Sequence, residues 1–209
     1  MTPEAGVSVS AGTERTNVER VFVLGIDPGL SRCGYGLVGR RTGGAGGTGG
    51  AGGTGGTGGL YAAAAGVIET DPDDPLHERL GLALRELRAL VEDLRPDVVV
   101  VERVFFQVNA RTAMSVGQAS GLALAVAAER GCDVVQYTSN EVKQALVGYG
   151  SATKDQVQKM VAAVLGLTDV PKPPDVADAL ALGVCHLTTM PFRRAVAAAT
   201  TPGGAAVTA

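Results

Sequence analysis

The stretch VFVLGIDPGLSRCGYGLV, residues 21–38, decides the fold of this chain. Its first apolar residues, several of them β-branched, predict a buried strand over 21–26, which Asp27 follows and Pro28-Gly29 ends. A carboxylate at the end of a buried strand must be solvated, hydrogen-bonded or bound to a cation, because burying it bare costs several kcal/mol. Taken alone, Asp27 fits a turn-forming residue and a functional acid equally well.

The size and composition predict one domain of ordinary size. The chain has 209 residues, a formal net charge of −3 and a sequence pI of about 5.4, so its total charge does not indicate a nucleic-acid-binding protein. It has neither an apolar run of signal-peptide length near its start nor a segment as apolar as a membrane span, and we expect a cytoplasmic protein. The three cysteines lack disulfide or zinc-site spacing, which predicts reduced thiols at Cys33, Cys132 and Cys185.

The pattern after the first strand alternates between strands and helices. Residues 34–40 and 60–70 are predicted to form a hairpin, with the glycine-rich tract 43–59 as a flexible loop insertion between them. Gly34 and Gly36 suggest room for a close backbone approach. Further strands are predicted over 97–102 and 133–137, and helices over 76–95, 110–130, 139–148, 153–167 and 174–189, with Ser139 and Asn140 as capping residues.

These elements predict an α/β fold with a mixed five-stranded sheet flanked by helices, in one domain over residues 20–190. We expect the polar segment 1–19 and the Ala/Thr/Gly/Pro-rich tail 195–209 to be disordered. In such sheets, chemistry gathers outside the carboxyl ends of the central strands.

Four carboxylates are candidates for a metal site at that edge. Asp27 and Glu102 each end an apolar strand, and they would emerge together if these strands are parallel neighbours. Asp175 and Asp178 form an i,i+3 pair on one face of the last helix. Crowded acids repel and raise one another's pKa, whereas one or two Mg²⁺ ions would keep them ionised and leave positions for phosphate oxygens. Two such ions can activate a water and stabilise the leaving oxygen of a phosphodiester.

Each of these acids also has a structural explanation. Asp175 and Asp178 lie in a first helical turn, where the helix dipole favours acids, and taken alone that explanation is the better one. Glu102 is harder to explain, because a glutamate after four valines gains nothing obvious from its strand. The order strand-Asp, strand-Glu and late D-x-x-D makes the joint case for a site stronger than any single acid does.

Four blocks of this sequence resemble the RuvC family of Holliday junction resolvases: GIDPGLSRCGYGL, VVVVERVFF, SNEVKQALVGYGSATKDQVQKMV and PPDVADALALGVCH. The DPG block alone is weakly specific, because sugar kinases and chaperone ATPases of the same superfold have a similar phosphate loop. The resemblance spans about residues 21–189 and implies a ribonuclease H-like fold. It implies a homodimer that cuts two like-polarity strands of a four-way DNA junction symmetrically during recombination and repair.

The resemblance also implies site residues, cofactors and partners. The metal-binding and catalytic acids of the family correspond by motif to Asp27, Glu102, Asp175 and Asp178. The implied cofactor is Mg²⁺, one or two ions per subunit, with Mn²⁺ as a substitute. The implied partners are four-way junction DNA and the RuvA and RuvB branch-migration complex, with no membrane contact.

Several residues are candidates for DNA contact. Phe105 is either a core residue or a platform that stacks on an unpaired base, and the resemblance assigns it the second role. Arg111, Lys143 and Lys154 are either solvated surface charges or phosphate contacts; the two lysines lie in blocks where the family uses lysines on phosphate. His186 lies about 12 Å along its helix from Asp178, too far for shared metal coordination, and we assign it no catalytic role.

Two alternative functions compete with junction cleavage. An ATPase or phosphotransferase of the same superfold would need a second subdomain and a late adenosine-binding glycine loop, and the sequence after Asp178 has neither. A non-catalytic junction-binding protein would not need all four acids.

Overall fold

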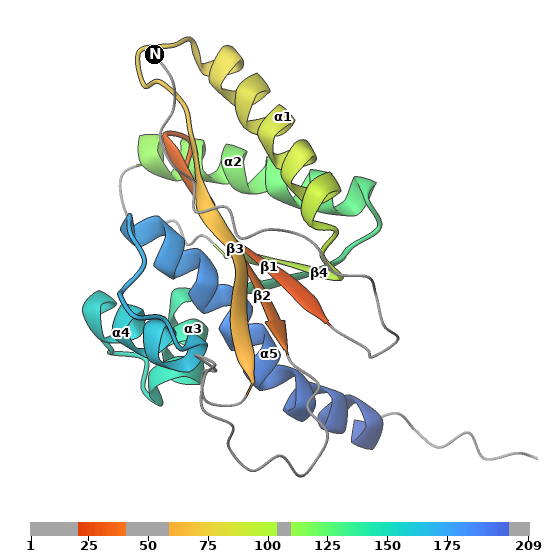
Figure 1. The fold of residues 1–209 in the computed structure, drawn as a ribbon. Helices are drawn as coiled ribbons and strands as arrows, with labels where there is room; N and C mark the ends of the chain where they lie inside the picture. The colour runs from red at the N-terminus through yellow and green to blue at the C-terminus, as the bar shows by residue number, and fades with distance from the viewer. Residues whose placement is uncertain (1–20, 41–58, 104–109, 201–209) are drawn as a thin grey trace, which may run out of the picture.

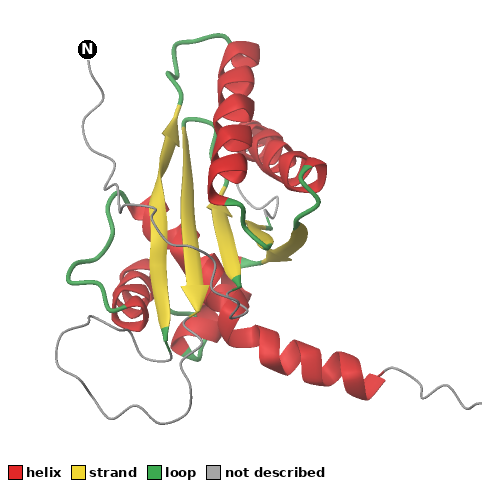
Figure 2. Cartoon of the chain, turned by 45° about the vertical axis from the view of Figure 1, so that its right-hand side comes forward, coloured by secondary structure: helices red, strands yellow, loops and turns green. Residues whose placement is uncertain are grey.

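A computed structural model describes residues 21–40, 59–103 and 110–200, except for the side chains of 110–112 and 191–200. Within these residues it confirms the predicted mixed sheet of five strands flanked by helices (Figures 1 and 2). The strands are β1 (Phe22–Asp27), β2 (Arg32–Arg40), β3 (Leu60–Glu69), β4 (Val98–Glu102) and β5 (Asp133–Tyr137). They lie in the order β3-β2-β1-β4-β5. β1 pairs antiparallel with β2 and parallel with β4, which itself pairs parallel with β5.

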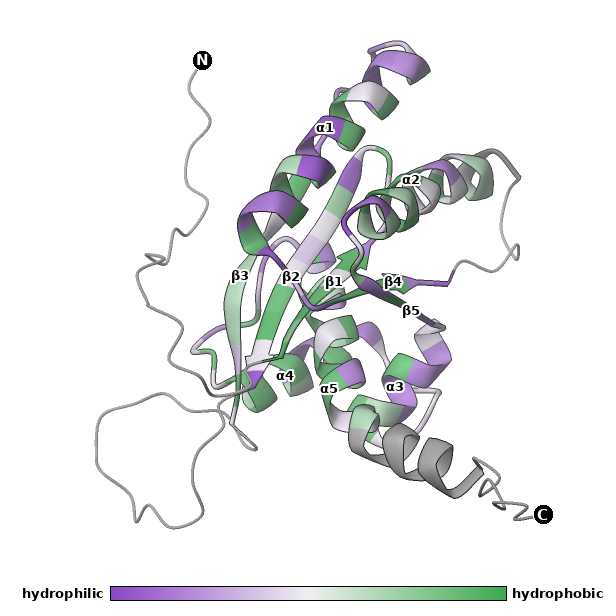
Figure 3. Ribbon diagram, turned by 90° about the vertical axis from the view of Figure 1, so that its right-hand side faces the viewer, coloured by the Kyte–Doolittle hydropathy of each residue, from purple (hydrophilic) through white to green (hydrophobic). Residues whose placement is uncertain are grey.

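Five helices cover the two faces of the sheet in separate layers (Figure 3). One layer contains α1 (Leu76–Leu94) and α2 (Ala110–Glu129), and the other contains α3 (Ser139–Val147), α4 (Lys154–Leu165) and α5 (Pro174–Thr200). None of the helices in the described segments combines the length and apolar character needed to cross a membrane. The cysteines Cys33, Cys132 and Cys185 are free, as predicted.

The alternation of side chains along β1 and β4 sets which layer each residue faces. Val23 and Val100 belong to the hydrophobic cluster of the α3–α5 layer, whereas Leu24 and Val99 belong to the cluster under α1 and α2. Both strands are therefore apolar on both faces, as expected for central strands covered on both sides. Because successive residues point to opposite faces, the last residues of both strands face the α3–α5 layer.

The N-terminus of α3 differs from the prediction by one residue. Thr138, rather than Ser139 or Asn140, is the N-cap: its hydroxyl accepts a hydrogen bond from the Glu141 backbone N–H at 3.1 Å. The Glu141 carboxylate in turn accepts one from the Thr138 N–H at 2.7 Å, which completes a capping box. The position of Glu141, three residues after the cap, explains why Thr138 takes this role.

The last helix is longer than predicted. We expected it to end at residue 189 and the tail from 195 to be disordered, but α5 continues to Thr200. Residues 195–199 read AVAAA, and alanine has the highest intrinsic helix propensity, which favours helix over this last part of the extension. The N-terminal extension and most of the glycine-rich loop, residues 43–58, lie outside the described residues.

The backbone of α5 lies directly on the sheet at two glycines. A Cβ atom built on Gly25 in β1 would lie 2.0 Å from the carbonyl oxygen of Ala179, and one on Gly34 in β2 would lie 2.2 Å from that of Asp175. At Gly36 the Leu180 side chain also comes close, with atoms 2.7 Å from the built Cβ. The predicted close approach at Gly34 and Gly36 is confirmed, and it brings the first turns of α5 against the ends of β1 and β2.

We predict that Gly25→Ala lowers the free energy of unfolding by about 1–3 kcal/mol, because its methyl group would collide with backbone rather than with a movable side chain. The matched control is Gly81→Ala in α1, where the nearest atom, an Arg85 guanidinium nitrogen, is 3.6 Å from the built Cβ. This control should gain about 0.5–1 kcal/mol from the helix preference of alanine. Urea denaturation measures both changes, and equal stabilities for the two variants would contradict the prediction.

Candidate active site

The ends of two parallel strands hold the first pair of acids. Ile26 of β1 is in register with Val101 of β4, so Asp27 and Glu102 follow them side by side at the carboxyl edge of the sheet. The condition set by the sequence, that these strands be parallel neighbours, is therefore met. Both acids face the layer that contains α5.

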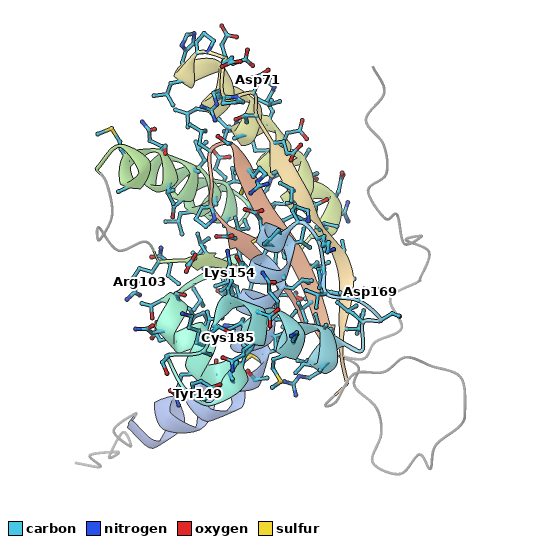
Figure 4. The ribbon with its side chains drawn as sticks, turned by 90° about the vertical axis from the view of Figure 1, so that its left-hand side faces the viewer. Asp71, Arg103, Tyr149, Lys154, Asp169 and Cys185 are labelled. Atoms are coloured by element: carbon cyan, nitrogen blue, oxygen red, sulfur yellow. The ribbon has the colours of Figure 1, made fainter. Side chains whose placement is uncertain are left out.

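A pocket at this edge collects three of the four predicted acids. Asp27, Glu102 and Asp178 line it together with two predicted DNA-contact residues, Lys143 of α3 and Lys154 of α4. Figure 4 shows Lys154 near the centre of the molecule, at the start of α4. The remaining lining residues are one hydroxyl-bearing and four apolar ones: Ser139, Val142, Val157, Ala181 and Leu182.

Asp27 is the most strongly perturbed of these acids. Burial, followed by the negative charges of Glu102 and Asp178, raises its pKa from 3.8 to about 7. Burial also raises the pKa of Glu102, while a hydrogen bond with Asp27 acts in the opposite direction. Two carboxyl groups can hydrogen-bond only if one is protonated, so near neutral pH Asp27 carries a proton for part of the time.

Lys154 supplies positive charge within the pocket. Its Nζ lies 2.6 Å from Oδ2 of Asp178, and this hydrogen bond is the main cause of the raised pKa of the lysine. Burial raises the pKa of Asp178, and its hydrogen bond to Lys154 opposes that shift. Sequence analysis predicted Lys154 only as a DNA contact, and it did not anticipate the contact with Asp178.

Asp175 lies beside the pocket instead of lining it. Its Oδ2 is 3.4 Å from Nη2 of Arg32, the first residue of β2, and it is a buried atom without a hydrogen-bond partner. Sequence reasoning missed Arg32, although it lies inside the GIDPGLSRCGYGL block. A buried carboxylate oxygen with no hydrogen bond is a position that a cation can fill.

The donor chemistry of this edge fits a hard divalent cation. Carboxylate oxygens are the ligands that Mg²⁺ prefers, and here they are accompanied by the unsatisfied oxygen of Asp175. Among the residues that the structure describes, however, no three His, Cys, Asp or Glu side chains are grouped closely enough to form a ready-made metal site. The acids are near one another, but two of them already contact basic side chains. Lys154 contacts Asp178, and Arg32 contacts Asp175.

Sequence analysis also considered Phe105, Arg111 and His186. Phe105 lies outside the described residues, and Arg111 lies in α2 with its side chain among those left out. His186 is buried, with its Nδ1 3.2 Å from the hydroxyl oxygen of Tyr137 in β5. The proposed stacking role of Phe105 and the lack of a catalytic role for His186 both stay predictions.

Comparison with known proteins identifies the family. Residues 23–186 match the family model described as "Crossover junction endodeoxyribonuclease RuvC". The chain belongs to the RuvC family. A RuvC from Salinispora arenicola is 47% identical over 177 residues, which cover 85% of this chain and 93% of the relative. A RuvC from Moorella thermoacetica is 42% identical over 174 residues, or 83% and 95% of the two chains.

Solved structures of RuvC proteins share the fold. Thermus thermophilus RuvC superimposes with a TM-score of 0.70 at 34% identity, over 83% of this chain and 97% of that one. The same protein in complex with a Holliday junction substrate gives 0.67 at 31% identity, over 82% and 96%. These matches bear out the ribonuclease H-like fold class predicted for this RuvC family member.

We predict that Asp27→Asn becomes more stable relative to the wild type as the pH rises from about 4 to 7 in the presence of a chelator. In this window the folded wild type binds more protons at Asp27 than the unfolded chain does, because the folded pKa is about 7 against an ordinary value of 3.8. Wild-type stability at this group is therefore lost as the pH rises, and the neutral asparagine has no such loss. Urea denaturation across the window measures the difference, and a difference independent of pH would contradict the prediction.

Proposed function

We propose that this chain is a structure-selective endonuclease that resolves Holliday junctions by paired nicking of two like-polarity DNA strands in recombination and repair. The observation that carries the proposal is the convergence of Asp27, Glu102 and Asp178 in one pocket, with Asp175 beside it. Membership of a family named for crossover junction cleavage supports it, as does the Thermus thermophilus relative solved in complex with a Holliday junction substrate.

The four acids would hold one or two Mg²⁺ ions, with Mn²⁺ as a substitute. When bound, such ions supply an activated water and stabilise the leaving oxygen of a phosphodiester. The contribution of this chain is to hold carboxylates at the ends of β1 and β4 and on α5. Asp27 must lose its proton to act as a ligand, so its raised pKa makes cation binding weaker below about pH 7.

The cations around the pocket would orient the DNA strand. Lys143 and Lys154 line it, and they would contact backbone phosphate beside the acids. Phe105 follows Glu102 by three residues, and we retain for it the proposed stacking on an unpaired base.

We further propose a homodimer, because a four-way junction presents two equivalent strands and symmetric cleavage needs two active sites. The RuvA and RuvB branch-migration complex is the proposed partner assembly. A cytoplasmic location, as expected from the sequence, is compatible with this DNA substrate.

We predict that the wild type makes paired nicks on a synthetic four-way junction, and that Asp175→Asn lowers the nicking rate at least about a hundredfold. Cation ligands contribute several kcal/mol of transition-state stabilisation, and each 1.36 kcal/mol changes a rate tenfold. The matched control is Asp93→Asn, which neutralises an exposed acid of α1 and should leave nicking unchanged. Linear duplex and ATP are tested in parallel, with and without Mg²⁺. ATP hydrolysis without nicking would instead favour the phosphotransferase alternative.

We also predict that Mg²⁺ raises the melting temperature of the wild type. A ligand at 100 times its Kd stabilises by about 2.7 kcal/mol, which for a chain of this size is about 5–10 °C. Asp27→Asn should reduce this rise, while Asp93→Asn should keep it. Differential scanning fluorimetry with Mg²⁺ or a chelator measures the shift, and an equal rise in the wild type and Asp27→Asn would exclude Asp27 as a ligand.

A further inference from the structure

Arg32 is placed at the rim of the acid site by the turn between β1 and β2. It is the first residue of β2, two positions before Gly34, which is in register with Asp27. Its side chain is 53% exposed, and its guanidinium reaches Asp175. The residue thus belongs to the active-site edge, on the β2 side of the carboxylates.

The contact between Arg32 and Asp175 is an ion pair without a hydrogen bond. The distance between Nη2 and Oδ2 is 3.4 Å, and that oxygen has no hydrogen-bond partner. The arginine is half-exposed, whereas the Asp175 oxygen is buried, so solvent and other anions can reach the guanidinium. Because, among the described residues, only this one long contact holds the guanidinium, the arginine can exchange Asp175 for another anion. Its planar fork of N–H donors matches the geometry of a phosphate group and can bind it bidentately.

The backbone that carries Arg32 is held firmly. Thr70 is buried, with 6% of its surface exposed. Its hydroxyl donates a hydrogen bond to the Leu30 carbonyl at 2.6 Å, and its backbone N–H donates one to the Ser31 carbonyl at 3.1 Å. Arg79 of α1 donates to the hydroxyls of Thr70 at 3.0 Å and Ser31 at 2.7 Å. Three of these hydrogen bonds fix Leu30 and Ser31, the two residues before Arg32, and the fourth holds Thr70 in place. The guanidinium of Arg32 is the loosely held part.

Each acid of α5 at this edge has a basic side chain beside it. Asp175 and Asp178 lie about one turn apart on α5, with Arg32 against the first and Lys154 against the second. A DNA strand that approaches this acidic edge is repelled unless cations lie on both sides of it. Lys143 and Lys154 provide them from α3 and α4, and Arg32 provides one from the sheet.

We propose that Arg32 binds a backbone phosphate of the DNA strand held at the carboxylate pocket, exchanging Asp175 for the phosphodiester. The proposal rests on the proposed nuclease function and adds a phosphate-binding residue to it. Thr70 and Arg79 act as positioning residues, because they hold the turn and not the DNA.

The test compares Arg32→Gln, Arg32→Lys and the wild type in binding to a labelled four-way junction over a salt series with a chelator. We expect Arg32→Gln to weaken binding about tenfold and to reduce the slope of log K against log salt by about 0.9 for each phosphate that is no longer neutralised. Arg32→Lys keeps the charge and should retain the slope with part of the affinity. The control, Arg88→Gln, removes a similarly exposed arginine that binds Glu129 between α1 and α2, and it should match the wild type.

A second measurement separates a role in binding from a role in folding. The melting temperature of Arg32→Gln should stay close to that of the wild type, because its guanidinium makes one long ion pair and no hydrogen bond to Asp175. If Arg32→Gln binds the junction with the affinity and salt slope of the wild type, and the wild type cuts junctions, the role of Arg32 is overturned while the nuclease proposal stands. A large fall in melting temperature with an unchanged salt slope would also overturn it, by making the role structural. Failure of the wild type to bind or cut a junction would overturn the nuclease proposal as well.

Discussion

The contact between the backbone of α5 and two strand glycines is the constraint on which the site depends. At Gly25 and Gly34 the helix lies so close to the sheet that even a methyl group would meet a carbonyl oxygen. This distance brings the first turns of α5 beside the ends of β1 and β2, where Asp175 and Asp178 come near Asp27. A sheet with side chains at these two positions would hold the helix farther away and separate the acids.

Crowding of acids has an electrostatic consequence that the neighbouring elements offset. Burial and mutual repulsion raise the pKa of Asp27 to about 7, so part of the negative charge is neutralised by protonation. Two cations on different elements, Lys154 of α4 and Arg32 of β2, neutralise part of the rest. The α3–α5 side of the sheet therefore contains both a hydrophobic core and the pocket lined by acids, whereas α1 and α2 cover the opposite face.

Much of the fold follows from local patterns that sequence analysis can detect. Unbroken valines before Glu102 predict a strand buried on both faces, and leucines at three- and four-residue steps predict α1. The errors lie where local signals compete. Thr138 caps α3 because Glu141 completes its capping box, and the alanines among residues 195–199 favour helix where a disordered tail was expected.

The sequence by itself determined which acids belong together, because their order along two apolar strands and the last helix matches one family. Only the tertiary structure decided which of these acids lines the pocket and which basic side chain each one contacts. Asp178 lines the pocket with Lys154, whereas Asp175 turns to Arg32. Such pairings depend on distances between elements far apart in the chain, set here by the approach of α5 to Gly25 and Gly34, and no local pattern encodes them.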